Sequence, residues 1–396
     1  MKKPLPVFLI DLDSVLVEPR GYRLAIQSAL GWFTERMGLG DLYPGEDAIA
    51  AFEAINMTCE WDIVSVLLAH IFNGLVKEHP ELTLPDDLLA ACDAVLDRHL
   101  DPPEMELDAL TTLLGSHFKP GMQYADLALQ LNQSPNGSRP FTHLIEHNLL
   151  ANILSGTRDL DGSLTTRVFQ HFTLGSKRFE QLSGFKKMFE SESFLLKYDQ
   201  VLLKEETRQT LLGVWQAGKL GAVIYTARPS LPEEGEAPNY NFSPEAEVAR
   251  EAVNLTQLPL IGAGKMGWLA LQLGARIDQL TKPSPVQALS AIAAAVTRQT
   301  GPALRAAADF HFKQKADYYR SLPPLSVHVF EDSGGNAASV GHTVDLLKAA
   351  GVSCSFKAWG IGDNPVKQQA LLKAGAQLEE DVNQAILQAL TLEELI

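Results

Sequence analysis

The pattern of apolar and polar residues separates one long helical stretch from two flanking regions that contain short apolar runs. Between residue 21 and about residue 204, apolar residues recur at helical spacing almost throughout, which predicts a series of helices, one of them over 141–154. Outside this stretch the apolar runs are short and continuous, as in strands that are buried on both faces. The predicted strands cover residues 7–10, 222–225, 258–261, 325–330 and 354–359.

Helical patterns separate these predicted strands. They cover residues 204–217, 245–255, 303–319, 340–350 and 366–374, together with a helix that starts at Pro285 after Ser284 as its N-cap. Residues 229–244 are rich in Pro, Glu and Asn and predict a loop. Alternating strands and helices indicate an α/β fold with a doubly wound, Rossmann-like parallel sheet. We therefore expect a discontinuous core, residues 1–17 and 205–396, with an all-α domain, residues 18–204, inserted after the first strand.

Composition narrows the class of protein. The chain has 396 residues, enough for two or three domains, and its formal net charge is -15. This charge argues against nucleic acid or an anionic membrane as a partner, because both require a basic surface. No run of 18 apolar residues exists, and Asp11 interrupts the first apolar run too early for a signal peptide. Three widely spaced cysteines suit a reducing compartment, so we expect a cytoplasmic protein of undetermined oligomeric state.

Polar side chains gather at the carboxyl ends of the predicted strands or in the loops that follow them. Ligands of open α/β sheets bind at this edge. A carboxylate can attack phosphorus, and a second can transfer a proton to the leaving oxygen. A hydroxyl and an ammonium can hold the phosphoryl oxygens, and further acids can bind Mg²⁺. The order of these groups fits phosphoryl transfer: Asp11 and Asp13, Thr226, Lys282, then Glu331 and Asp332.

Four short segments carry a family resemblance. Residues 11–15 (DLDSV), 224–228 (IYTAR), 282–285 (KPSP) and 329–333 (VFEDS) match, in order, motifs I to IV of the haloacid dehalogenase (HAD) superfamily. The resemblance covers residues 1–17 and about 205–385, and each motif follows or ends a predicted strand or lies in a connecting loop. The helical insertion lies between motifs I and II, where this family has its type C1 cap.

The resemblance implies a role for each matching residue. Asp11 would be the nucleophile that becomes an aspartyl-phosphate, and Asp13 the general acid/base. Thr226 would bind the phosphoryl group, and Lys282 would stabilise its charge. Mg²⁺ would be coordinated by Asp11, the backbone carbonyl of Asp13 and Asp332, with Glu331 as a further contributor.

Position 13 also separates branches of the family. The dehalogenases lack an aspartate two residues after the nucleophile, so Asp13 favours phosphate ester chemistry. Many members carry another acid four or five residues after the motif IV aspartate, where this chain has Asn336 and Ala337. The adjacent acids Glu331 and Asp332 resemble the EDS variant of C1-capped phosphatases and phosphoglucomutases.

Substrate contacts are expected from two parts of the chain. Ala227 and Arg228 follow Thr226 directly and are candidates for the pocket. Lys177 and Arg178 lie in a basic stretch of the predicted all-α domain, which forms either a solvated helix face or a surface that meets an anionic substrate. Residues 262–267 (GAGKMG) match G-x-G-x-x-G, but no acidic residue follows at the spacing of a dinucleotide site, so a tight loop is favoured.

The leading hypothesis is a Mg²⁺-dependent phosphatase that hydrolyses a small phosphorylated metabolite through an aspartyl-phosphate. One alternative is a phosphomutase acting on a sugar phosphate. Another is a catalytically silent protein that keeps the fold for binding. The intact set of acidic and basic residues argues against the silent alternative, whereas the choice between hydrolysis and isomerisation stays open.

Overall fold

The computed structural model describes residues 3–119, 121–135, 137–145, 147–233 and 242–396. The chain divides into two compact units. The α/β unit comprises Met1–Arg20, Tyr198–Pro238 and Phe242–Ile396, and the helical unit comprises Gly21–Lys197. The sequence places these boundaries after residues 17 and 204. Residues 234–241 of the predicted loop over 229–244 lie outside the described residues.

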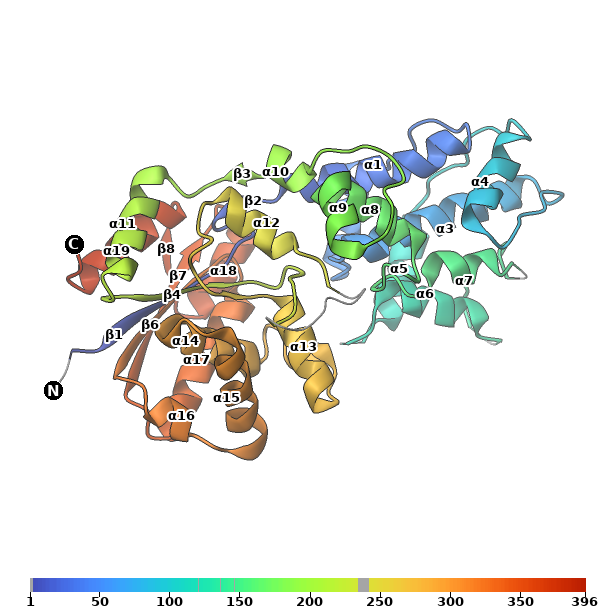
Figure 1. The fold of residues 1–396 in the computed structure, drawn as a ribbon. Coiled ribbons are helices and arrows are strands. Elements are labelled where there is room, and N and C mark those ends of the chain that lie inside the picture. The colour runs from blue at the N-terminus through green and yellow to red at the C-terminus, as the bar shows by residue number, and fades with distance from the viewer. Residues whose placement is uncertain (1–2, 120, 136, 146, 234–241) are drawn as a thin grey trace. The chain divides into compact units, whose positions relative to one another are not determined.

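A parallel sheet forms the centre of the α/β unit (Figure 1). Among the described residues it has six strands in the order β5-β4-β1-β6-β7-β8. The most apolar run of the N-terminus becomes β1, which is buried between β4 and β6 as a strand without a polar face should be. The strands are β1 (Leu5–Ile10), β4 (Gly221–Tyr225), β5 (Leu260–Ile261), β6 (Leu325–Glu331), β7 (Cys354–Ile361) and β8 (Gln377–Glu379).

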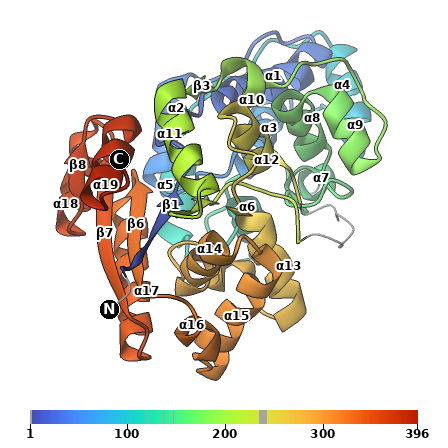
Figure 2. The same cartoon turned by 60° about the vertical axis from the view of Figure 1, so that its left-hand side comes forward.

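Helices cover both faces of this sheet, and α14 and α15 lie side by side in Figures 1 and 2. Val7 and Leu9 of β1 belong to the core beneath α13, α14, α15 and α17, whereas Phe8 and Ile10 belong to the core beneath α11, α12 and α19. The helices are α11 (Glu205–Gln216), α12 (Glu245–Ala252), α13 (Ala263–Leu273), η1 (Ile277–Gln279), α14 (Pro285–Thr297), α15 (Thr300–Lys313), α16 (Asp317–Arg320), α17 (Gly334–Ala349), α18 (Pro365–Lys373) and α19 (Val382–Leu392).

The register of the central strands aligns their carboxyl ends. Ile10 pairs with Ile224 of β4 and with Phe330 of β6. The residues that follow these three positions therefore come level at one edge of the sheet. This alignment brings Asp11 beside the end of β4 and beside Glu331, although these residues lie far apart in the sequence.

Several predicted elements differ from those observed. The helix expected over 303–319 is two helices, α15 and α16, because the chain adopts a left-handed conformation at Gln314 (φ 55°). Among the described residues of the range 141–154, the α-helix covers Leu149–Leu154 alone. Helix α17 begins at Gly334 rather than at residue 340, since the Ser333 hydroxyl accepts a hydrogen bond from the Asn336 amide and caps it. Strand β8 and helix α19 were not predicted.

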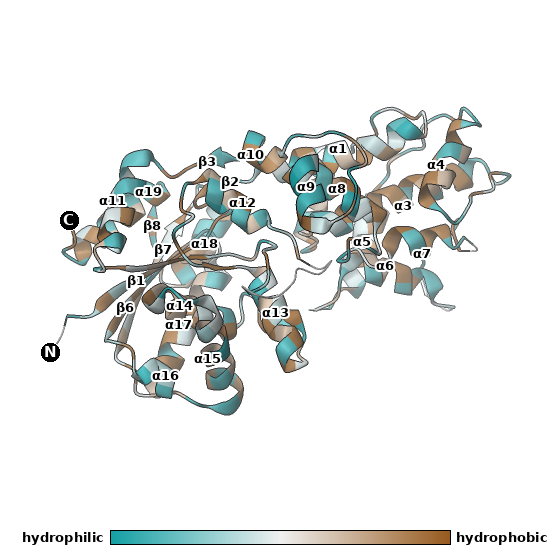
Figure 3. Cartoon of the chain, in the orientation of Figure 1, coloured by the Kyte–Doolittle hydropathy of each residue, from teal (hydrophilic) through white to brown (hydrophobic). Residues whose placement is uncertain are grey.

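The helical unit is built from amphipathic helices, whose hydrophobic and hydrophilic residues alternate along each ribbon in Figure 3. Helix α3 contributes 13 buried residues, more than any other described helix of this unit. Within the described ranges, no helix combines the length and apolar character needed to cross a membrane. The helices are α1 (Arg20–Arg36), α2 (Glu46–Ala54), α3 (Glu60–Glu78), α4 (Leu88–Leu96), α5 (Asp108–His117), α6 (Tyr124–Gln133), α7 (Leu149–Leu154), α8 (Leu164–Leu174), α9 (Ser176–Ser183) and α10 (Phe194–Tyr198).

Two short strands mark where the chain leaves and re-enters the α/β unit. Strand β2 (Val17–Glu18) pairs antiparallel with β3 (Gln200–Val201). The Leu202 amide also donates a hydrogen bond to the Leu16 carbonyl. The outgoing and the returning segment are thus held together within the α/β unit, next to the turn that carries Asp13.

Candidate active site

Asp11 is the first residue after β1 and is almost fully buried. Its amide donates to the Phe330 carbonyl, which continues the pairing with β6, and its Oδ1 accepts a hydrogen bond from the Leu12 amide at 2.9 Å. The chain then turns tightly, because the Leu12 carbonyl accepts from the amides of Leu16 and Val17. Ser14 has a left-handed backbone (φ 59°) within this turn, an arrangement that often marks functional sites.

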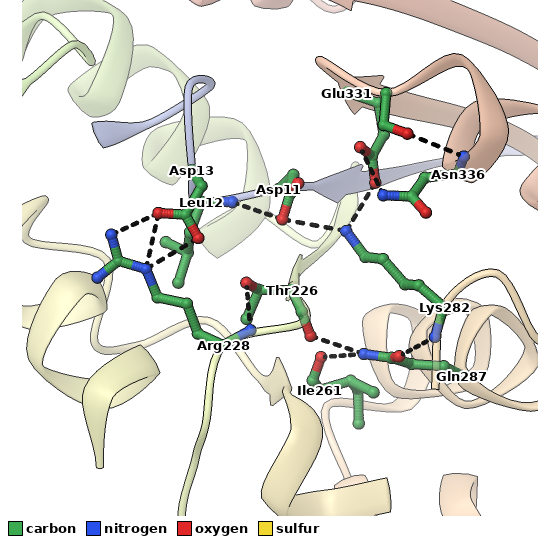
Figure 4. A network of polar contacts seen from close by, with 11 residues as sticks. Asp11, Leu12, Asp13, Thr226, Arg228, Ile261, Lys282, Gln287, Glu331 and Asn336 are labelled. Atoms are coloured by element: carbon green, nitrogen blue, oxygen red, sulfur yellow. Dashed lines mark hydrogen bonds and ion pairs between the residues drawn. The ribbon is translucent and has the colours of Figure 1, made fainter. Parts of the chain in front are cut away.

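A buried ammonium joins two of the predicted acids (Figure 4). Lys282 Nζ lies 3.0 Å from Asp11 Oδ1 and 2.6 Å from Glu331 Oε1, and only 2% of the Lys282 side chain is exposed. The ammonium also lies 4.2 Å from the centre of the Tyr225 ring, a favourable cation–π distance. The side chains of motifs I, III and IV therefore meet at the aligned strand ends.

Burial controls the ionisation of these groups. It raises the pKa of Asp11, against the opposing effect of Lys282. It also raises the pKa of Glu331 to about 8, and the charge of Asp11 acts in the same direction. Burial alone would lower the pKa of Lys282, but the Asp11 and Glu331 carboxylates outweigh it and raise that pKa. The Lys282 ammonium carries one positive charge, whereas Asp11 and Glu331 carry two negative charges when both are ionised.

The same acids can hold a metal ion. Asp11, Glu331 and Asp332 each offer a carboxylate oxygen, and these oxygens all lie within 4.8 Å of one another. Carboxylate oxygens are the ligands that a hard cation such as Mg²⁺ prefers, and a cation would offset their mutual repulsion. The donor set therefore fits the metal expected from the sequence. The carboxylate of Asp13 is not part of this group, while the sequence assigned its backbone carbonyl to the metal.

Two further contacts surround the motif IV acids. Lys367 of α18 forms an ion pair with Asp332. Asn336, which occupies one of the positions where many HAD members have another acid, donates from Nδ2 to Glu331 Oε2 at 3.3 Å. The side-chain amide of Asn336 in α17 thus contacts Glu331, and Lys367 partly balances the charge of Asp332.

Gln287 in the first turn of α14 links the loops of motifs II and III (Figure 4). Its Nε2 donates to the carbonyls of Thr226 at 2.7 Å and Ile261 at 3.1 Å. Its Oε1 accepts from the Lys282 amide at 2.8 Å. The Thr226 side chain is fully buried, and its Oγ1 accepts a hydrogen bond from the Arg228 amide. Gln287 therefore fixes the backbone that carries both Thr226 and Lys282.

Arg228 contacts an acid of the site. Its Nε lies 2.9 Å from Asp13 Oδ1 and 3.0 Å from Oδ2, and its Nη2 lies 2.5 Å from Oδ1 and 3.2 Å from Asp199 Oδ2. The sequence predicted Arg228 in the substrate pocket, but its side chain is only 2% exposed and its guanidinium is directed to these carboxylates. Ala227, by contrast, is exposed beside it.

The two predicted substrate contacts Lys177 and Arg178 belong to the helical unit and not to the α/β unit. Lys177 and Arg178 lie in the first turn of α9. Lys177 is exposed, which suits the solvated helix face considered from the sequence. Their contact with a substrate stays a prediction.

The glycine-rich segment 262–267 has a packing role. The Gly264 amide donates to Ser230 Oγ at 2.9 Å, and the Ala263 amide donates to the Arg228 carbonyl. A Cβ atom at Gly264 would lie 1.7 Å from the Ser230 carbonyl oxygen. Gly264 therefore allows α13 to approach the loop after β4. The tight loop expected over 262–267 is not formed, because α13 begins at Ala263 and these residues are its N-cap and first turn.

Three residues of the site were missed in the sequence, namely Asp199, Gln287 and Lys367. Gln287 left a weak signal, because it is a large polar residue in a mostly apolar helix directly after motif III. Asp199 and Lys367 left none, since each lies far from its partner in the chain and belongs to none of the four motifs.

Comparison with known proteins shows similarity at the level of structure. No protein-family model and no curated protein matches the sequence. The X-ray structure of Northeast Structural Genomics Consortium target ZR25 matches 99% of this chain and 100% of its own, with a TM-score of 0.60 and 15% identity. Phosphatase Tt82 from Thermococcus thioreducens matches 92% of this chain and 99% of its own, with a TM-score of 0.42 and 14% identity. The likeness to ZR25 supports the α/β fold with its helical insertion, and we draw nothing from the weaker likeness to Tt82.

Proposed function

We propose that this protein is a Mg²⁺-dependent phosphatase of the HAD type, which hydrolyses the monoester of a small phosphorylated metabolite. The observation that carries the proposal is the meeting of Asp11, Lys282 and Glu331 at the aligned strand ends, with Thr226 on the neighbouring loop. Each residue comes from a different motif, and together they supply a nucleophile, a cation and metal ligands.

In the first step an Asp11 carboxylate oxygen attacks phosphorus and the ester P–O bond breaks. Asp13 gives its proton to the departing oxygen, so that the alcohol leaves neutral. Lys282 and the Thr226 hydroxyl would hold the phosphoryl oxygens on which charge accumulates. Burial makes an ionised Asp11 costly, and the neighbouring Lys282 ammonium favours the ionised nucleophile.

In the second step a water molecule attacks the phosphorus of the aspartyl-phosphate. Asp13 accepts the proton of that water, the bond between phosphorus and the Asp11 oxygen breaks, and phosphate leaves. Asp11, Glu331 and Asp332 would hold Mg²⁺, which supplies charge stabilisation to the phosphoryl oxygens when it is bound. Nucleophilic attack and both proton transfers are carried out by the side chains of Asp11 and Asp13.

The test is phosphate release from an aryl phosphate and from a panel of phosphorylated metabolites, with and without Mg²⁺. Asp11→Asn keeps the shape of the side chain but removes its nucleophilic charge, so release should fall to background. Asp345→Asn, at an exposed residue of α17, serves as the matched control and should retain full activity. Undiminished release by Asp11→Asn would overturn the proposal, and isomerisation of a sugar phosphate without release would assign the chain to the mutases instead.

A further inference from the structure

Arg228 joins three segments of the α/β unit. It follows β4, it contacts Asp13 in the turn after β1, and it contacts Asp199 just before β3. Two of its nitrogens face the Asp13 carboxylate, and Nη2 is shared with Asp199. A guanidinium holds a carboxylate in a fixed plane in this way, whereas an ammonium provides only a point charge.

The two carboxylates are exposed to different extents. The Asp13 side chain is 35% exposed, but the side chains of Arg228 and Asp199 are only 2% and 1% exposed. Buried charges are kept where they are paired, and removing one partner is strongly destabilising. Asp199 therefore anchors the guanidinium on its buried side, while Asp13 stays accessible to a reacting group.

The local backbone supports this arrangement. Asp13 forms an isolated bridge with Val17, and Val17 pairs with Val201 in the β2–β3 ladder. Asp199 lies directly before that ladder, so the outgoing and returning segments of the chain both end at the same guanidinium. The position of the Asp13 carboxylate thus depends on a residue that the chain reaches only after the whole helical insertion.

We propose that Arg228 and Asp199 are positioning residues, which hold the Asp13 carboxylate in the orientation needed to transfer a proton to the leaving oxygen. The inference rests on the proposed phosphatase function and deepens it, because it assigns two residues to the acid/base step. It also replaces the interpretation of Arg228 as a substrate contact. A substrate contact would govern substrate binding, whereas this clamp governs only the reactions that depend on Asp13.

The leaving group separates these roles. A poor leaving group such as phenolate needs a proton from Asp13, whereas 2,4-dinitrophenolate departs without one. General acid catalysis contributes about 100-fold or more, so Arg228→Met should lower kcat/KM for phenyl phosphate by about 100-fold and for 2,4-dinitrophenyl phosphate by less than about 5-fold. Asp199→Asn, which keeps the shape of its side chain, should show the same selectivity with a smaller loss. Arg320→Met, at an exposed arginine, should change neither rate.

Three results would overturn the clamp. Equal losses with both substrates would indicate general damage, a higher KM at unchanged kcat would indicate a substrate contact, and unchanged kinetics would exclude any role. Arg228→Lys and Asp199→Asn extend the comparison should Arg228→Met not fold, and the melting temperature of each variant reports folding. If Asp11→Asn is inactive while the two substrates respond alike in the Arg228 variants, the clamp fails and the phosphatase proposal stands. If Asp11→Asn remains active, the phosphatase proposal itself fails.

Discussion

Individual carboxylates of the α/β unit differ in how burial affects them. Glu331 is fully buried and shares Lys282 with Asp11, so one ammonium faces two carboxylates there. Glu247 of α12 is partly buried and accepts a hydrogen bond from the Leu231 amide at 3.0 Å. Burial raises the pKa of Glu247 to about 7, although Arg250 and Lys265 act against it. The pKa of Glu247 therefore reports the effect of burial on a carboxylate that lies outside the candidate site.

Glu247 should make stability depend on pH. Its pKa in the folded state lies above its ordinary value of 4.5, so its contribution to stability is fully present below pH 4.5 and is lost as pH rises through about 7. Glu247→Gln mimics the protonated form and can still accept from the Leu231 amide. We expect this variant to gain stability relative to the wild type between pH 5 and 8, by at most about 3 kcal/mol.

Denaturant unfolding at several pH values measures this difference, with the exposed Glu251→Gln in the same helix as the control. A constant difference between Glu247→Gln and the wild type across this range would contradict the prediction.

At the scale of elements, close approach decides where helices can lie. Helix α13 contacts the loop after β4 through Gly264, where an added Cβ atom would lie 1.7 Å from a backbone oxygen. Gly213 in α11 has nothing within 4 Å of the same atom. The two glycines are both helical, so one substitution separates the effect of close approach from the effect of helix propensity.

Gly264→Ala should destabilise the protein, because the backbone of α13 must move away from Ser230. We expect a loss of about 2 kcal/mol or more in the free energy of unfolding, within the range of overpacked sites. Gly213→Ala should instead gain about 0.5–1 kcal/mol, because alanine favours a helix interior more than glycine does. Thermal and denaturant unfolding of both variants measures the contrast, and similar effects of the two substitutions would show that Gly264 is not constrained.

At the scale of the whole molecule, the chain has two compact units with separate cores. Leu9 is fully buried in the sheet of the α/β unit, and Leu67 is fully buried in α3 of the helical unit. Since a compact unit with its own core can unfold as a cooperative element, we expect substitutions in the two cores to act on different transitions.

Leu9→Ala and Leu67→Ala should each cost about 2–5 kcal/mol, the usual range for a cavity left by leucine. Calorimetry should show Leu9→Ala lowering the transition of the α/β unit and Leu67→Ala lowering that of the helical unit. Tryptophan signals offer a second assignment, since Trp215 lies in α11 and Trp61 in α3. A single transition that both substitutions shift equally would mean that the two units unfold as one.

Sequence alone determined the five strands that apolar runs predict and the order of the reactive groups, because both are local, whereas the short strand β8 has no such run. A strand buried on both faces requires a continuous apolar run, and residues 7–10 and 222–225 are such runs, each followed directly by a polar residue. The same locality explains the errors. Apolar spacing continues through 303–319, but the break at Gln314 depends on a single backbone conformation that the pattern does not record.

Only the tertiary structure decided which groups meet. Strand register aligns Asp11 with the end of β6, and the packing of α14 against the sheet brings Gln287 to the carbonyl of Thr226. The ion pair of Asp13 with Arg228 also depends on the tertiary structure. Asp199, which follows the helical insertion in the chain, contacts the same guanidinium. Such contacts join residues far apart in the chain, and hydrophobic periodicity, which reports neighbours along one element, carries no information about them.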